Sequence, residues 1–187
     1  MKEKEVNTET ERQKLLQISE ISLMLDTYDD IFSDFDPRPY SERSLSIDLL
    51  EEAERASKDK RGMHLELNFL IPLNIRNKSL EEIIKRRLKE HFRKHFNRLE
   101  KEKKDIIKKG LLFTFIGISV MFIATLMLHK NQGKTLLINF LIILFEPAGW
   151  FLFWEGLDQA IFESKKINPR LKFYEKMHKC HINFFSY

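Results

Sequence analysis

The sequence predicts a mainly α-helical membrane protein, in which a two-helix transmembrane hairpin carries a small cytoplasmic α+β domain. Two observations lead to this fold class. The first is a pair of apolar segments, 110–128 and 135–154, each about as long as a helix that crosses a bilayer. The second is the charge of the whole chain, in which Lys, Arg, Glu and Asp make up 32% of 187 residues and crowd outside these segments. This split is typical of a soluble part attached to a membrane part.

The region before the hairpin is expected to contain helices and one strand. Residues 1–33 are predicted to form an N-terminal amphipathic helix, because apolar residues between 12 and 32 recur at multiples of three and four. Residues 34–109 are predicted to form the cytoplasmic α+β region. Within it, Ser46 is placed to cap a short helix that ends near Lys58.

A strand and a long helix complete this region. Alternation over 63–71, with Leu65, Leu67, Phe69 and Ile71 on one face, predicts a strand. The capping-box pair Ser79 and Glu82 predicts the start of a stalk helix, which lacks Pro and Gly up to Lys109 and so continues into the first span. Gly110 is the expected bend.

The hairpin itself is predicted from its lengths. Transmembrane helix 1 is placed over 110–128, which has no charged residue, and transmembrane helix 2 over 135–162. The polar connection between them is so short that the helices are expected to be antiparallel neighbours.

The cytoplasmic tail, residues 163–187, alternates over 179–185, and we expect a short strand that pairs with 63–71. Pairing between subunits and a disordered tail are the alternatives.

The flanking charges predict the orientation. Eight basic residues lie in 90–109 and six in 163–182, whereas the connection between the spans holds only Lys130 and Lys134. By the positive-inside rule, both termini face the cytoplasm, which predicts a protein of the inner (plasma) membrane. The N-terminal residues have no apolar core of the signal-peptide type, so the spans are expected to direct insertion. The net charge of +4 is attributed to this topology, and no nucleic-acid partner is expected.

Glu146 and Pro147 form the predicted polar site of the membrane. A carboxylate at the bilayer centre costs roughly 2.5–3.5 kcal/mol, so Glu146 is expected to be protonated, paired, or turned toward water or another helix. Its expected partners are Thr114, Ser119 or Thr125 of the first span, or a neighbouring subunit. A proton or ion path is the alternative. Pro147 removes one backbone hydrogen bond and predicts a kink.

Trp150 and Trp154 are predicted to be interfacial aromatics at the cytoplasmic end of the second span. Glu155 and Asp158 follow one turn apart as membrane-interface charges. They are expected to pair with basic residues of the stalk such as Arg98 and Lys101, with a cation site as the alternative.

No pattern in the sequence predicts catalysis, a cofactor or a metal. His91 and His95 have metal-ligand spacing, but no third ligand is evident. Arg86 and His91 have the R-x4-H spacing of HEPN ribonucleases, which is a weak match. No Gly-rich phosphate loop, Ser/His/Asp set or CxxC pair is present, and the chain has one cysteine, Cys180. We therefore expect a protein that is not an enzyme.

Three motifs together resemble a family of uncharacterised prokaryotic two-span membrane proteins. They are the DPxP…ER pattern over 36–43, the pair His91-Phe92 on the stalk, and a Trp- and Asp-containing second span. The sequence differs from the family pattern at Glu155-Gly156 and at Glu163-Ser164. The resemblance covers roughly 28–187 and implies topology and architecture, without any activity.

Two hypotheses for function follow. The first is a non-enzymatic scaffold, assembly or regulatory protein that forms homo-oligomers in the lipid bilayer, with a possible further membrane-protein partner. The second is a small oligomeric proton- or ion-conducting protein that uses Glu146. Two spans cannot enclose a pore alone, so the second hypothesis requires several copies.

Overall fold

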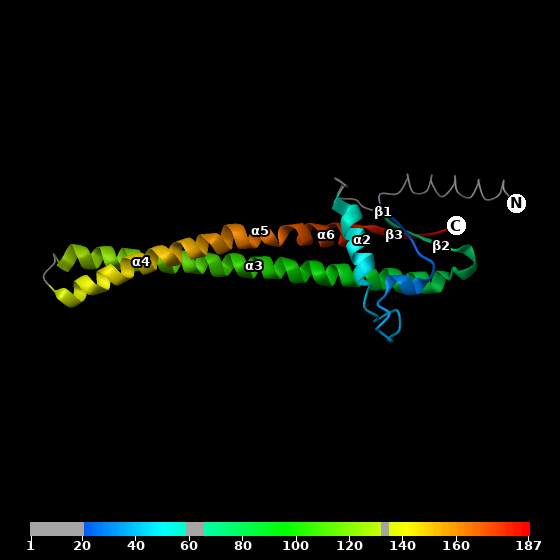
Figure 1. The fold of residues 1–187 in the computed structure, drawn as a ribbon, viewed down its shortest axis with the longest axis horizontal. Helices are drawn as coiled ribbons and strands as arrows, with labels where there is room; N and C mark the ends of the chain where they lie inside the picture. The colour runs from blue at the N-terminus through cyan, green and yellow to red at the C-terminus, as the bar shows by residue number, and fades with distance from the viewer. Residues whose placement is uncertain (1–20, 59–65, 132–134) are drawn as a thin grey trace. The chain divides into compact units, whose positions relative to one another are not determined.

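The computed structural model describes residues 21–58, 66–131 and 135–187, which are mostly helical and include two long apolar helices and a small sheet (Figure 1). The chain divides into two compact units. The sheet unit comprises the described residues up to Phe96 together with Lys172–Tyr187. The hairpin unit comprises Asn97–Leu171, which lies between these two parts in the sequence.

A parallel sheet organises the sheet unit. Among the described residues it has three strands in the order β1 (Ile21–Met24), β2 (Glu66–Ile71) and β3 (His181–Ser186). Five consecutive residues of β2, 67–71, are buried, as expected for a central parallel strand that is covered on both faces. The polar Asn68 among them accepts a hydrogen bond from Asn183 Nδ2 at 3.0 Å, which satisfies its buried amide oxygen.

The strand predicted in the tail is confirmed. β3 pairs with β2 within the chain, from Glu66 opposite His181 to Ile71 opposite Ser186. The connection between these two paired strands contains the whole hairpin unit. Because both strands belong to one sheet, the segments before and after the hairpin return to the same compact unit.

The predicted N-terminal helix is wrong where the structure describes it. Residues 1–20 lie outside the described residues, but Ile21–Met24 forms β1, and a short 3-10 turn, η1 (Tyr28–Ile31), follows. The spacing of apolar residues there fits a helix equally well. Pairing of β1 with β2, which buries Ile21, decides the outcome, because tertiary contacts override a local pattern.

The helices of the sheet unit follow the prediction with one correction. α2 (Ile47–Lys58) lies where the short helix was expected. A 3-10 turn, η2 (Leu73–Ile75), precedes α3 (Lys78–Asn131). The predicted cap Ser79 is already inside α3, and the carboxamide oxygen of Asn77 accepts hydrogen bonds from the amides of Ser79 and Leu80 at 3.0 and 3.3 Å. Asn77 therefore caps the helix.

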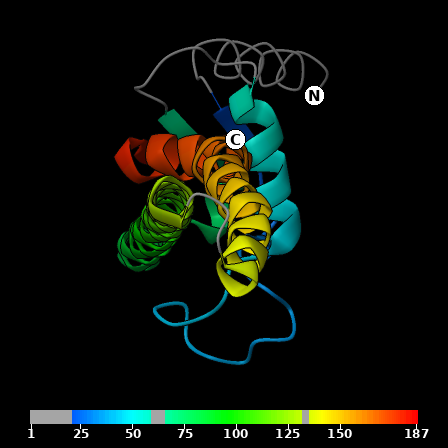
Figure 2. The same ribbon diagram turned by 90° about the vertical axis from the view of Figure 1, so that its left-hand side faces the viewer.

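The hairpin unit contains the continuation of α3 and the helix α4 (Leu136–Asp158), which lie side by side in Figures 1 and 2. The stalk and the first apolar segment are one helix, as predicted, and Gly110 does not interrupt it. After α4 come a π-helical turn, η3 (Gln159–Glu163), and a short helix, α5 (Ser164–Lys166). The last helix, α6 (Asn168–Lys179), begins in the hairpin unit and continues into the sheet unit.

Candidate functional site

The candidate site is the pair of apolar helices in the hairpin unit. Both are long and apolar enough to cross a membrane, and only 11% of the residues in the most apolar 18-residue stretch of each are buried within the chain. A core helix of a soluble domain would be mostly buried, so this surface is not an internal core. The large apolar side chains exposed on it include Leu111, Leu112, Phe115, Phe122, Leu136, Phe140, Ile143, Trp150 and Phe151.

Four glycines bring α3 and α4 into backbone contact. A Cβ atom added to Gly117 would lie 2.5 Å from the amide nitrogen of Phe153 and 2.7 Å from the carbonyl oxygen of Gly149. One added to Gly110 would lie 2.6 Å from the carbonyl oxygen of Gly156. Gly110 thus opposes Gly156 and Gly117 opposes Gly149, and the two glycines of each helix are seven positions apart. We call these four residues the glycine seam.

The glycine seam is a close contact between two helix backbones. Small residues at a helix interface let the backbones approach closely, which is how helices associate where lipid removes the hydrophobic driving force. From the sequence, Gly110 was predicted only as a bend, and no role was predicted for Gly117 or Gly156. The equal spacing of seven in both segments is the signal that would have revealed them.

Glu146 lies outside this seam, on the exposed surface of α4. The predicted hydrogen bonds to the first span of the same chain are wrong. The hydroxyls of Thr114, Ser119 and Thr125 each donate to the carbonyl four residues earlier, at 2.9 Å. Within the part of the chain that the structure describes, the carboxyl group of Glu146 has no hydrogen bond or ion pair.

The remaining predicted site residues lie on the last turns of α4 and beside Glu146. Pro147 is exposed inside α4, which continues through it as one helix. Trp150 and Trp154 are more than half exposed and pack edge to face, with ring centroids 5.6 Å apart. They therefore form one aromatic surface next to the carboxylates at the end of the helix.

The two carboxylates at the end of α4 do not form the predicted ion pairs with the stalk. Glu155 Oε1 accepts a hydrogen bond from Gln159 Nε2 at 2.9 Å. Among the described residues of the hairpin unit, neither Glu155 nor Asp158 pairs with Arg98 or Lys101. Glu155 is instead held by a neighbour on the turn that follows α4, and the charge of Asp158 acts on Lys166 of α5.

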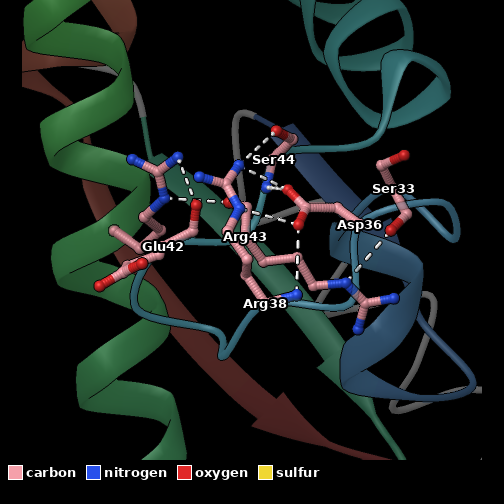
Figure 3. Close-up of polar contacts among 7 residues, drawn as sticks. Ser33, Asp36, Arg38, Glu42, Arg43 and Ser44 are labelled. Atoms are coloured by element: carbon pink, nitrogen blue, oxygen red, sulfur yellow. Dashed lines mark hydrogen bonds and ion pairs between the residues drawn. The ribbon is translucent and has the colours of Figure 1, made fainter.

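The loop of residues 33–44 in the sheet unit, here called the Asp36 loop, contains the DPxP…ER motif and is densely hydrogen-bonded (Figure 3). The carboxylate of Asp36 accepts two hydrogen bonds from the Arg38 guanidinium, at 2.9 and 2.7 Å, and one from the Ser44 amide at 2.7 Å. These donors, the Arg38 guanidinium first, hold the pKa of Asp36 well below its usual range.

Two further arginines fix the Asp36 loop to the rest of the sheet unit. The Arg43 guanidinium donates to the carbonyl of Ser33 at 3.1 Å and to Asp29 Oδ1 at 2.6 Å. Arg87 of α3 donates to the carbonyls of Arg43 and Glu42, at 3.0 and 3.3 Å. The motif that carries the family resemblance therefore builds a rigid loop.

The histidine pair does not form a metal site with other described residues. The rings of His91 and His95 stack at 4.3 Å, and His95 stacks on Tyr174 of α6 at 5.1 Å. No group of three or more His, Cys, Asp or Glu side chains suited to a metal occurs in the described part of the chain. Burial first, then the charges of His95, Arg87 and Lys94, lower the pKa of His91 to about 4, which keeps its imidazole neutral at pH 7.

Comparison with known proteins adds no further constraint. The chain matches no protein-family model, no curated protein and no solved structure. The resemblance to two-span membrane proteins therefore stays a prediction, and the function is argued from the geometry alone.

Proposed function

We propose that the protein is an integral membrane scaffold, in which the α3–α4 hairpin crosses the bilayer and the sheet unit lies in the cytoplasm. The observation that carries the proposal is the exposure of the two apolar helices, many of whose large apolar side chains are exposed on the surface. A lipid bilayer covers such side chains along the whole length of both helices.

The residue composition of both apolar segments favours their insertion into a bilayer. Residues 135–154 contain twelve Leu, Ile and Phe residues, each favourable by about 0.3–0.6 kcal/mol at the centre of a membrane helix, or about 4–7 kcal/mol together. An intramembrane carboxylate such as Glu146 costs about 2.5–3.5 kcal/mol. The apolar residues outweigh Glu146, but the margin is a few kcal/mol. The first span has no charge and therefore no such cost.

The sheet supports the predicted orientation. β2 precedes the hairpin and β3 follows it, and the two strands pair along six residues. A hairpin that crosses the membrane twice places both strands on one side, whereas a single crossing would separate them. The excess of basic residues beside both spans then assigns that side to the cytoplasm, at the inner (plasma) membrane.

The exposed carboxyl group of Glu146 supports assembly of several copies. In the bilayer it needs a hydrogen-bond partner, and the described part of the chain supplies none. A protonated Glu146 that bonds its counterpart in a neighbouring copy meets this need, and such bonds between membrane helices contribute about 1–2 kcal/mol in model peptides. The protein is thus proposed to be a homo-oligomer that Glu146 stabilises.

The same exposed carboxyl group favours a second candidate function, an oligomeric proton- or ion-conducting assembly with Glu146 facing a shared path. The two candidates differ in one measurement. A conducting assembly reconstituted in liposomes carries a proton or cation flux that Glu146→Gln abolishes, whereas a scaffold carries none.

The test of insertion uses membranes that contain the full-length protein. Extraction with alkaline carbonate should leave it in the membrane pellet. A cysteine that replaces Lys130, near the end of α3, in a Cys180→Ala background should react with a membrane-impermeant maleimide only from the outside of intact cells. A protein released by carbonate, or a Lys130→Cys variant labelled only after cell lysis, contradicts the proposal.

The test of assembly uses the purified protein in mild detergent. Light scattering with size-exclusion chromatography should give an oligomer for the wild type and smaller species for Glu146→Gln. The matched control is Glu163→Gln, which removes an acid of η3 that pairs with Lys166 at the surface. A wild-type monomer, or equal effects of the two substitutions, contradicts the role of Glu146.

A further inference from the structure

The Asp36 loop displays an aromatic side chain with almost no cover. Phe35 is 98% exposed, more than any other large apolar side chain that the structure describes. It stands directly beside Asp36, whose carboxylate accepts four hydrogen bonds. Exposure of a Phe on a flexible tail does not indicate a binding surface, but here hydrogen bonds fix the backbone that carries it.

The rigidity of this loop has several independent sources. Its ends are joined by the hydrogen bond from the Ser33 amide to the Ser44 carbonyl, at 2.9 Å. The loop also packs on Phe32, the residue before it: the ring of Tyr40 stacks on the Phe32 ring at 5.1 Å, and the Arg43 guanidinium lies 5.9 Å from its centre. A side chain held out by a preorganised backbone loses little conformational entropy when it binds, as in the hot spots of protein interfaces.

A pocket lies next to the same loop. It has a volume of about 320 Å³, at the low end of the range for ligand pockets. Its lining residues come from the Asp36 loop and from α3: Arg38, Pro39, Tyr40, Ser41, Arg43, Leu80 and Ile83. Pro39, Leu80 and Ile83 give the pocket apolar walls, and Tyr40 gives it an aromatic wall. The pocket therefore suits an aromatic side chain.

We propose that Phe35 of one copy inserts into this pocket of a second copy, and that the second copy does the same in return. The projecting side chain and the pocket belong to one loop, and a two-fold dimer requires that kind of self-complementary surface. The contact uses only residues of the sheet unit, so it goes beyond the hairpin and is independent of Glu146.

Charge complementarity supports a second copy as the occupant. Asp34 precedes Phe35, is exposed, and has no hydrogen bond or ion pair among the described residues. The pocket wall contains Arg38 and Arg43, whose Nη1 and Nη2 atoms, respectively, have no acceptor in the described part of the chain. A Phe35 that enters the pocket brings Asp34 toward these guanidinium groups, and their edges can also lie against the Phe ring.

The test places a photo-activatable benzoyl-phenylalanine at position 35 of the full-length protein in nanodiscs. Heavy-isotope and light-isotope protein are mixed before irradiation, so that cross-links between copies are recognised by mass. We expect mixed-isotope cross-links from position 35 to 38–43 or 80–83. The matched control carries the photo-reactive residue at Leu73, which is 70% exposed in the same unit, and should give none of these cross-links.

A second variant measures the strength of the contact. Phe35→Ala leaves the fold intact because the side chain is exposed. Measured in the Glu146→Gln background, which removes the proposed hairpin contact, it should weaken dimerisation at least about 30-fold, the equivalent of the ~2 kcal/mol that defines a hot spot. Cross-links from position 35 to other surfaces, cross-links to a different protein, or unchanged dimerisation of Phe35→Ala would overturn the inference.

Repeating the cross-linking in the Glu146→Gln background separates the two interfaces. The position-35 cross-links should persist when the hairpin oligomer is lost, because the loop contact does not involve Glu146; their loss in Glu146→Gln would overturn this independence. Carbonate extraction of the protein would overturn the membrane proposal and leave the loop contact standing.

Discussion

The glycine seam makes the sharpest prediction about the hairpin. In Gly117→Ala, the new methyl group would lie 2.5 Å from the Phe153 amide nitrogen, 2.7 Å from the Gly149 carbonyl oxygen and 2.9 Å from the Phe153 Cα atom. Real Cβ atoms essentially never approach other atoms this closely. All three neighbours are backbone atoms, which cannot rotate away, so α3 and α4 must move apart.

The magnitude follows from two opposing effects. Overpacking of a close contact costs about 1–3 kcal/mol. Replacing a helical glycine by alanine returns up to about 1 kcal/mol of helix propensity. Gly117→Ala should therefore destabilise the hairpin by up to about 2 kcal/mol, and Gly117→Leu, which adds more atoms at the same place, by more.

Gly149→Ala is the matched control, because it lies on the same seam with a softer neighbour. Its new methyl group would meet the Cγ atom of Met121 at 2.6 Å, and the nearest backbone atom would be 3.0 Å away. The flexible Met121 side chain can move, so Gly149→Ala should cost less than Gly117→Ala.

The assay is unfolding of the purified protein by SDS in mixed micelles, followed by the fluorescence of Trp150 and Trp154 and by circular dichroism. We expect the midpoints to fall in the order wild type, Gly149→Ala, Gly117→Ala, Gly117→Leu. Two results would refute the close backbone contact. One is a Gly117→Ala midpoint equal to or above that of the wild type, and the other is a Gly149→Ala midpoint lower than that of Gly117→Ala.

Three further predictions concern the sheet unit. In the fold the pKa of His91 is about 4, below its ordinary value of 6.5, so between these pH values the unfolded chain binds a proton that the folded chain does not. Stability should therefore fall as the pH drops from about 6.5 to 4, and His91→Phe should flatten this dependence in thermal unfolding curves. The fold also lowers the pKa of Asp36, and here it is the ionised form that the folded state stabilises, so the contribution of Asp36 to stability is present above about pH 4 and is lost as the pH falls below it. Asp36→Asn should therefore accelerate proteolysis of the Asp36 loop at pH 7, whereas Asp34→Asn should not. Asn77→Ala removes the acceptor that caps α3 and should lower stability by about 1 kcal/mol, whereas Ser79→Ala should have little effect; equal losses would contradict the assignment of the cap.

The sequence allowed the hairpin and the tail strand to be predicted because their signals are local. Residues 110–128 are apolar throughout, and alternation in the tail shows directly in the residue order. Both signals depend on neighbouring residues, whose spacing is the same in the sequence and in the folded element. The location of α2 and the continuity of α3 through Lys109 were predictable for the same reason.

The features that were missed depend on partners distant in the sequence. β1 is a strand because it pairs with β2, more than forty residues later. The glycine seam depends on how two antiparallel helices align, which no single helix shows. The role of the Asp36 loop depends on Arg87 of α3, a residue that the sequence presents as one more exposed helical cation.

The order of the elements links the hairpin to the sheet. β3 buries Ile182 and Phe184 and pairs with β2 along six residues, so the sheet is incomplete until the chain has passed through the entire hairpin. In the proposed membrane topology, β3 reaches β2 only when α4 has crossed the bilayer in the direction opposite to α3. The small energetic margin of α4 therefore affects more than its own insertion. The glycine seam, which packs α4 against the charge-free segment 110–128 of α3, stabilises the helix on which completion of the sheet depends.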